Sequence, residues 1–208
     1  MSVSPIPPEL LARLRAVSFP TLGHLLEDGF VDSGIRALVP NVKVVGRAVT
    51  LQVTDADAVA VNQALASLTP GDVLVIDMGG DHTHAPVGAV TACAAASAGA
   101  AAIVVDGVVT DILELRETKL PVFARGTSLL TTKRLGAGRS QLNIPVRCGG
   151  AVARPGDLVL ADDNGVMFLD ADTAARVVDE ALASDQAEPA TLARLRAGEP
   201  VTRVLLGS

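Results

Sequence analysis

The chain has 208 residues, of which 49% are hydrophobic and 19% are charged, and its formal net charge is −6. This composition excludes a disordered chain and provides enough apolar residues for a substantial core. The negative charge and the absence of Trp and Tyr argue against a nucleic-acid partner, which needs basic and aromatic surfaces. No apolar run is long enough to span a membrane and the N-terminus lacks the pattern of a signal peptide, so we expect a cytoplasmic protein.

The first third of the chain predicts two helices with a strand between them. Leucines at helical spacing predict a helix over residues 8–29. Residues 41–53 are rich in β-branched side chains and roughly alternate, which predicts a strand with a possible bulge at Gly46. Residues 55–68 predict a second helix, closed by a turn.

The middle of the chain alternates short apolar strands with helices. We expect strands at 73–77, 101–106 and 121–125, separated by helices at 86–99 and 111–118. Strands that are almost unbroken apolar runs are buried on both faces. The alternation therefore predicts an α/β fold with a parallel or mixed sheet covered on both sides.

The last quarter of the chain predicts a hairpin and a helical tail. Residues 155–170 contain two strands joined by Asp-Asn-Gly, a common hairpin turn. Residues 173–199 form an amphipathic helical pattern that we expect to break near Pro189. Because no linker or internal repeat interrupts the chain, we expect a single domain over residues 1–208.

The loop and helix start after the 73–77 strand form a candidate anion site. In open α/β sheets, ligands bind beyond the carboxyl ends of the strands. Pro86 suits a first helical position, which would leave the amides of Gly88, Ala89 and Val90 free in or near the first turn. Free amides and the helix dipole together favour a carboxylate or phosphate. The alternative is that these small residues only allow tight packing of the helix on the sheet.

The loop after the 101–106 strand carries a second candidate, Asp111. With Glu114 three positions later, it has the form of a capping box at a helix start. Alternatively, Asp111 is a hard oxygen ligand for a divalent cation whose other positions are filled by water, as Mg²⁺ prefers. The two interpretations are compatible.

Two histidines lie in the first of these loops, in the segment Asp81-His82-Thr83-His84. If the segment is extended, His82 and His84 face the same side and could bind a metal or transfer protons. The alternative is a solvated polar loop. The cysteines, Cys93 and Cys148, lie in apolar or Gly-rich surroundings, and we expect two buried free thiols, with a disulfide as the alternative.

These segments resemble the regulator of ribonuclease activity A family, which includes the class II 4-hydroxy-4-methyl-2-oxoglutarate aldolases. The likeness runs through "GDVLVID", "APVGAV", "GAAAIVVDGVVTD", "LPVFARGTS" and "PVRCGGAVARPGDLVLADDNGV". It implies a swivelling α/β/α domain with a mixed sheet and a C-terminal helical tail. It also implies a trimer or a dimer of trimers, with the active site between subunits.

The resemblance assigns roles to residues of both loops. It places Gly88, Ala89, Val90 and Thr91 on the segment whose backbone amides hold the substrate carboxylate. It places Asp111 on the family's metal-ligand aspartate, which implies Mg²⁺ or Mn²⁺ as cofactor.

The chain departs from the family pattern at two positions. Thr110 stands where the aldolases carry an arginine that binds the 2-oxo acid, and Ala89 replaces an acidic residue that orders metal-bound waters. Glu188 aligns loosely with a glutamate that a neighbouring subunit can contribute. Threonine supplies a hydroxyl and no charge. Either another cation compensates, with His82, His84 and Arg125 as candidates, or the substrate differs, or catalysis is lost.

The leading hypothesis is a divalent-metal-dependent lyase acting on a small 2-oxo acid, by pyruvate-forming aldol cleavage or oxaloacetate-type decarboxylation. Asp111, His82 and His84 are its candidate catalytic residues, and we expect a homotrimer or hexamer without nucleic-acid or membrane partners. One alternative is a non-catalytic regulator, like the family members that inhibit an RNA-degrading endonuclease. Another is a divergent biosynthetic enzyme that uses the loop 81–84.

Overall fold

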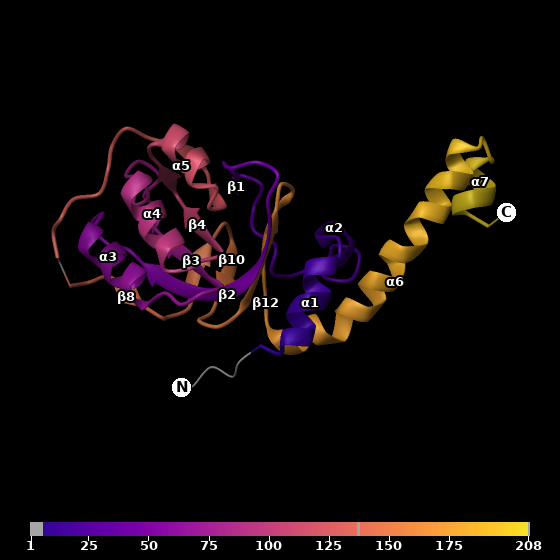
Figure 1. Ribbon diagram of the computed structural model, residues 1–208, viewed down its shortest axis with the longest axis horizontal. Helices are drawn as coiled ribbons and strands as arrows, with labels where there is room; N and C mark the ends of the chain where they lie inside the picture. The colour runs from indigo at the N-terminus through magenta and orange to yellow at the C-terminus, as the bar shows by residue number, and fades with distance from the viewer. Residues whose placement is uncertain (1–5, 137, 208) are drawn as a thin grey trace.

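The computed structural model describes residues 6–136 and 138–207, which fold around an eight-stranded mixed sheet (Figure 1). The helices are α1 Pro8–Ala16, α2 Phe19–Leu22, α3 Ala58–Ser67, α4 Ala89–Ser97, α5 Ile112–Thr118, α6 Ala171–Arg196 and α7 Val201–Leu205. The strands of the main sheet are β1 Arg36–Ala37, β2 Lys43–Gln52, β3 Asp72–Asp77, β4 Ala102–Asp106, β6 Val122–Ala124, β8 Gln141–Leu142, β11 Leu158–Asp162 and β12 Gly165–Leu169. Two small sheets pair β5 Val108–Val109 with β7 Gly126–Thr127, and β9 Val146–Cys148 with β10 Ala151–Ala153.

The main sheet has the order β1-β6-β4-β3-β2-β11-β12, with β8 beside β2. Its centre is parallel, because β2, β3, β4 and β6 run in one direction. The β11–β12 hairpin extends the sheet in antiparallel fashion and turns at residues 163–164, as the Asp-Asn-Gly sequence predicts. The predicted mixed α/β architecture is confirmed, and the carboxyl ends of β3 and β4 lie side by side.

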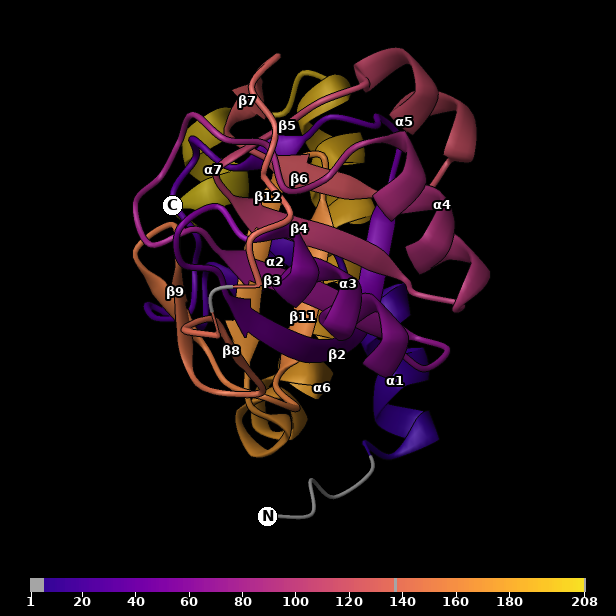
Figure 2. The ribbon, with the colours of Figure 1, turned by 90° about the vertical axis from the view of Figure 1, so that its left-hand side faces the viewer.

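Different elements cover the two faces of the central strands. The helices α3, α4 and α5 lie over one face, where Ala92 and Ala95 of α4 are fully buried and allow close packing on Ile76 and Ile103. The hairpin β9–β10 packs on the other face, against residues such as Val75. Figure 2 shows β9 on the opposite side of the molecule from α4 and α5.

The remaining helices pack on the β11–β12 end of the sheet. The helices α1, α2 and α6 bury leucines and alanines against both hairpin strands. Asp185 of α6 fixes α2, since its carboxylate accepts hydrogen bonds from Ser18 N (2.6 Å) and Thr21 Oγ1 (2.5 Å). Beyond this contact α6 projects from the body as a long arm that carries α7 (Figure 1). None of the helices described is long and apolar enough to cross a bilayer.

Several local predictions are wrong. The helix expected over 8–29 is two helices, because Pro20 cannot donate a hydrogen bond to the preceding turn and instead lies in the first turn of α2, which begins at Phe19. The tail does not break, and α6 continues through Pro189. Gly46 forms no bulge, since the β2–β11 register is continuous through it; its missing side chain instead lets Val73 approach.

Helix α4 begins at Ala89 and not at Pro86, so the helix starts three residues later than expected. The cysteine prediction holds for one residue only. Both thiols are free, but Cys93 on α4 is exposed, whereas burial raises the pKa of Cys148 far above its usual value. Cys93 is exposed because it lies on the face of α4 that points away from the sheet.

Candidate functional site

The two loops identified from the sequence meet at the carboxyl ends of β3 and β4. Asp111, after β5, directs its carboxylate to the start of α4, where Ala89 N donates to Oδ2 at 2.9 Å. Gly88 precedes this amide, and a Cβ there would lie 2.5 Å from Asp111 Oδ2 and 2.8 Å from Thr110 Cγ2. Only glycine therefore permits the approach of the aspartate to the helix.

The capping-box interpretation of Asp111 is wrong. Its side chain makes no capping hydrogen bond to α5, the helix that follows it. The backbone of Asp111 is left-handed, with φ of 55°. Its carbonyl oxygen, and not its side chain, accepts a hydrogen bond from α5, donated by Leu115 N. A left-handed aspartate costs on the order of 1 kcal/mol. This conformation turns the carboxylate from its own helix to α4, where it stays exposed.

The amide segment at the start of α4 fits the predicted anion site, although the helix starts later than expected. Gly88 is the N-cap, and Ala89, Val90 and Thr91 form the first turn. Within the described residues, the amides of Val90 and Thr91 donate no hydrogen bond. They therefore lie free beside the Asp111 carboxylate, at the positive end of the helix dipole.

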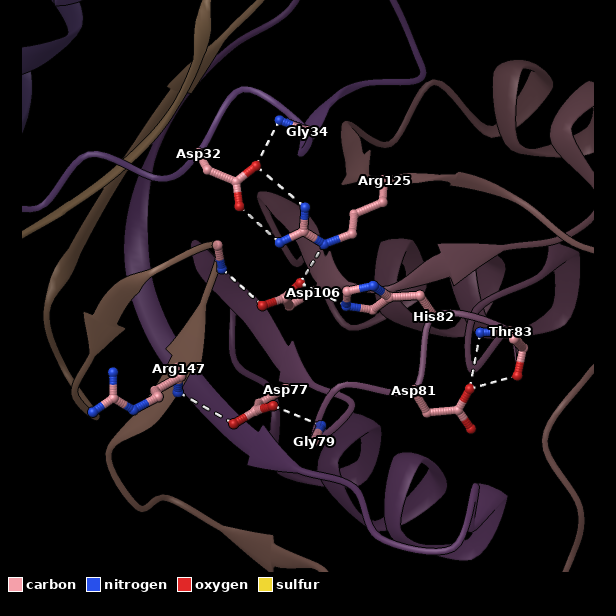
Figure 3. Close-up of polar contacts among 11 residues, drawn as sticks. Asp32, Gly34, Asp77, Gly79, Asp81, His82, Thr83, Asp106, Arg125 and Arg147 are labelled. Carbon is pink, nitrogen blue, oxygen red and sulfur yellow. Dashed lines mark hydrogen bonds and ion pairs between the residues drawn. The ribbon is translucent and has the colours of Figure 1, made fainter.

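A charged network lies at the carboxyl end of β4, and the sequence patterns did not indicate it (Figure 3). Arg125, after β6, donates to Asp106 Oδ1 through Nε at 2.6 Å and to both oxygens of Asp32 at 2.8 and 3.2 Å. The hydrogen bond to Asp32 raises the pKa of Arg125, and Arg125 in turn lowers the pKa of Asp32. Because two carboxylates balance its charge, Arg125 is not a free cation that could replace the family arginine. Asp32 lies in the loop before β1, so no local sequence pattern indicated that it belongs to the site.

His82 belongs to this network. Its Nε2 lies 3.4 Å from Asp106 Oδ1, and the ring points to Asp106 and Arg125 in Figure 3. Asp106 also accepts from Gly149 N at 2.8 Å, which ties the β9–β10 turn to the end of β4. His82 is therefore, with Asp32, one of the exposed members of a cluster that joins five segments of the chain.

His84 has a different partner. Its Nδ1 lies 2.6 Å from Asp81 Oδ2, and the other oxygen of Asp81 accepts from Thr83 N, Thr83 Oγ1 and His84 N. The loop 81–84 is thus a tight turn and not an extended segment, and the two imidazoles contact different aspartates. In the described part of the chain, no hydrogen bond or ion pair joins either histidine to Asp111.

Glu188 lies on the projecting part of α6. Within this chain it lines a cavity with His24 and Thr191, among others, and none of the residues at the Asp111 site lines that cavity. A contribution of Glu188 to the Asp111 site would require a neighbouring subunit.

The metal-binding capacity of the described residues is limited to single side chains and pairs. They contain no group of three or more His, Cys, Asp or Glu side chains that could hold an ion. A divalent ion held by Asp111 would therefore find at most one other such side chain among the described residues. Such a site suits a mostly hydrated Mg²⁺ or Mn²⁺, and does not suit Zn²⁺, which takes several nitrogen or sulfur ligands.

The fold and these loops define an α/β protein in which free amides at a helix start lie beside an exposed aspartate. Comparison with known proteins gives its family. Residues 22–168 match the RraA-like family, described as Aldolase/RraA. The chain belongs to this family, and the resemblance deduced from the sequence is confirmed.

Three relatives illustrate the family. A Halalkalibacterium halodurans protein, provisionally named 4-hydroxy-4-methyl-2-oxoglutarate aldolase, is 38% identical over 77% of this chain and 76% of its own. A Streptomyces coelicolor structure, described as an unusual member of the RNase ES inhibitor RraA protein family, is 31% identical with a TM-score of 0.76, over 88% of this chain and 95% of its own. An uncharacterised Pseudomonas syringae pv. tomato protein is 26% identical with a TM-score of 0.80, over 100% of this chain and 98% of its own.

Proposed function

We propose that the protein is a divalent-metal-dependent lyase that releases pyruvate from a small 2-oxo acid, by aldol cleavage or by decarboxylation of an oxaloacetate-type substrate. One observation carries the proposal: the Asp111 carboxylate lies 2.9 Å from the first amide of α4, next to free amides of the same helix turn. A 2-oxo acid has its carboxylate and its carbonyl oxygen on adjacent carbons. The helix start and an ion at Asp111 offer partners for these two groups side by side.

Each residue of the site has a defined task in this proposal. The amides of Val90 and Thr91 bind the substrate carboxylate, and the helix dipole favours its charge. Ala89 N holds Asp111 Oδ2, which fixes the carboxylate without neutralising it. When bound at Asp111, Mg²⁺ or Mn²⁺ would supply a Lewis acid for the 2-oxo oxygen.

Asp111→Asn tests the proposal. The amide still accepts the hydrogen bond of Ala89 and fits the same space, but carries no charge for an ion. We expect pyruvate release from 4-hydroxy-4-methyl-2-oxoglutarate or oxaloacetate with Mg²⁺ or Mn²⁺ to fall by about 100-fold or more, and metal binding by titration calorimetry to disappear. Glu114→Gln, which removes an exposed charge from α5, is the matched control. Pyruvate release within twofold of the wild type in Asp111→Asn would contradict the proposal.

Thr110 sets the substrate preference in this proposal. Its hydroxyl donates to Asp111 Oδ1 at 3.3 Å, in a place where an arginine would bring a fixed positive charge. We expect low activity on the usual substrate of the aldolases. Thr110→Arg should raise it by about 10-fold or more, and together with Ala89→Glu by more than the product of the single effects, since both act on one bound substrate. A double-mutant cycle with pyruvate release as its readout measures this coupling, and strictly multiplicative or absent gains would contradict the assignment.

A second candidate function is non-catalytic regulation. It is favoured by the likeness to the Streptomyces coelicolor protein, which is described as belonging to an RNase inhibitor family. Inhibition of an RNA-degrading endonuclease by both the wild type and Asp111→Asn, without pyruvate release from either substrate, would replace the lyase proposal. We also propose that the protein acts in the cytoplasm as a homotrimer or hexamer.

A further inference from the structure

The pair formed by Asp81 and His84 has the geometry that orients a histidine for proton transfer or ligand binding. The 2.6 Å contact uses Nδ1 of the imidazole. Within the described residues, Nε2 has no hydrogen-bond partner, and the side chain keeps 30% of its surface exposed. A carboxylate on one ring nitrogen therefore leaves the other nitrogen for a ligand.

Asp81 is held as an anion by its own turn. Desolvation raises the pKa of Asp81, but the hydrogen bonds from Thr83 and His84 outweigh it and hold that pKa well below its usual range. An ionised Asp81 can only accept, so the neutral imidazole of His84 carries its proton on Nδ1. Nε2 is then an acceptor, which requires a donor group on any ligand.

His84 lines a cavity of about 560 Å³ that lies apart from the Asp111 site. Its lining combines the loop 79–84 with the segment after β2 and with Lys133, and it includes none of the residues 88–91, Thr110 or Asp111. The volume suits a small organic molecule. Asp55 in the lining is paired with Arg139.

Lys133 gives the cavity a positive charge. In the part of the chain that the structure describes, its ammonium group has neither an ion pair nor a side-chain hydrogen bond. The backbone of Lys133 is fixed, because its N–H donates to Ala56 O and its carbonyl accepts from Ala58 N. An unpaired cation on a fixed backbone is a partner for a carboxylate.

We propose that His84, Asp81 and Lys133 form a second small-molecule site, which binds a small carboxylate with a hydroxyl group on the neighbouring carbon. The carboxylate pairs with Lys133, and the hydroxyl donates to Nε2 of His84. This site is independent of the lyase chemistry at Asp111. It gives the loop 81–84, which has no role in the proposed lyase reaction, a role in binding a ligand.

Nuclear magnetic resonance of the imidazole nitrogens tests the proposal in the full chain, because three histidines give three spin systems. Glycolate and acetate serve as probes, since they differ by the hydroxyl group alone. We expect glycolate, above neutral pH, to shift Nε2 of His84 saturably and to leave His24 unshifted. Acetate should bind about tenfold more weakly or worse.

Three variants test which residues bind glycolate. Lys133→Gln should weaken glycolate binding about tenfold or more, whereas Lys119→Gln, a lysine outside the cavity, should leave it unchanged. Asp111→Asn should also leave it unchanged, so failure of the lyase proposal and failure of this one give different results. The proposal is overturned if glycolate leaves His84 unshifted, if acetate binds equally well, or if binding survives in Lys133→Gln.

Discussion

At the scale of single residues, the contact between Gly88 and Asp111 shows how a missing side chain makes a site possible. Asp111 could cap its own helix, as its sequence context suggests, but its left-handed backbone directs the carboxylate elsewhere. The carboxylate lies next to a residue without a Cβ, in space that a side chain would fill. Neither fact alone makes a site, and both are needed to place an acid beside free amides.

Gly88→Ala is therefore expected to disturb the site more than the fold. Its φ of −140° is allowed for alanine, so backbone strain is not the cause. The added Cβ would lie 2.5 Å from Asp111 Oδ2 and must displace it, at a cost of about 1–3 kcal/mol in the free energy of unfolding. Urea denaturation measures this cost, and metal titration measures the loss of the site. Ala94→Ser, on the exposed side of the same helix, is the control; equal stability of both variants would contradict the contact.

Asp81 makes a second residue-scale prediction, concerning pH. Its pKa in the folded protein is lowered below the unfolded value of about 3.9. The stability it contributes is thus fully present above the unfolded pKa and is lost as pH falls through the folded pKa. Asp81→Asn should destabilise the protein near neutral pH, and the difference should vanish in acid. Urea denaturation of both proteins over a pH series checks this, and a difference that grows as pH falls would contradict it.

At the scale of elements, α6 shows that a proline can lie inside a long exposed helix. Pro189 cannot donate to the carbonyl of Asp185, so one hydrogen bond of the ladder is missing. The helix persists because its first half is held by the core, through Ala174, Val178 and Ala181. The arm beyond the proline depends on this anchor.

Pro189→Ala should restore the missing hydrogen bond and stabilise the arm by about 1–3 kcal/mol locally. Amide hydrogen exchange of α6 measures the effect directly, and we expect slower exchange on both sides of residue 189 while the sheet is unchanged. Pro155→Ala, ahead of β11, serves as the control substitution. Unchanged exchange in α6 would show that the proline does not limit the stability of the arm.

Elements were predictable from sequence where one local pattern dominates. Apolar runs indicated β3 and β4, and Asp-Asn-Gly indicated the β11–β12 hairpin. Sequence periodicity did not predict the structure where that structure depends on contacts between residues far apart in the sequence. The start of α4 and the true role of Asp111 are set by their mutual contact, over 22 positions of sequence, which no local window contains. The loops that form the candidate site were identifiable, but their geometry was not, and Asp32 and Lys133 had no local signal.

At the scale of the whole molecule, the exposed aliphatic side chains lead us to expect that the chain assembles with other copies of itself. Leu129 is 99% exposed, in the segment that runs from β7 past the cavity of His84. On the arm, Val201, Leu205 and Leu206 are 61%, 59% and 74% exposed. Exposed apolar groups of this size are candidates for contact with partners, and identical chains commonly assemble in closed symmetry.

We therefore expect a homotrimer or hexamer in solution. Light scattering coupled to size exclusion should give three or six times the chain mass at micromolar concentration. Leu129→Glu and Leu206→Glu separate the two surfaces, since each puts a charge where apolar contact would be lost. If only one surface builds the assembly, one variant should dissociate to smaller species while the other, as its matched control, stays intact.

If Glu188 acts on a neighbouring subunit's site, pyruvate release should fall with dissociation and also in Glu188→Gln, whose assembly is intact. A monomeric wild type would contradict the assembly, and with it any shared site.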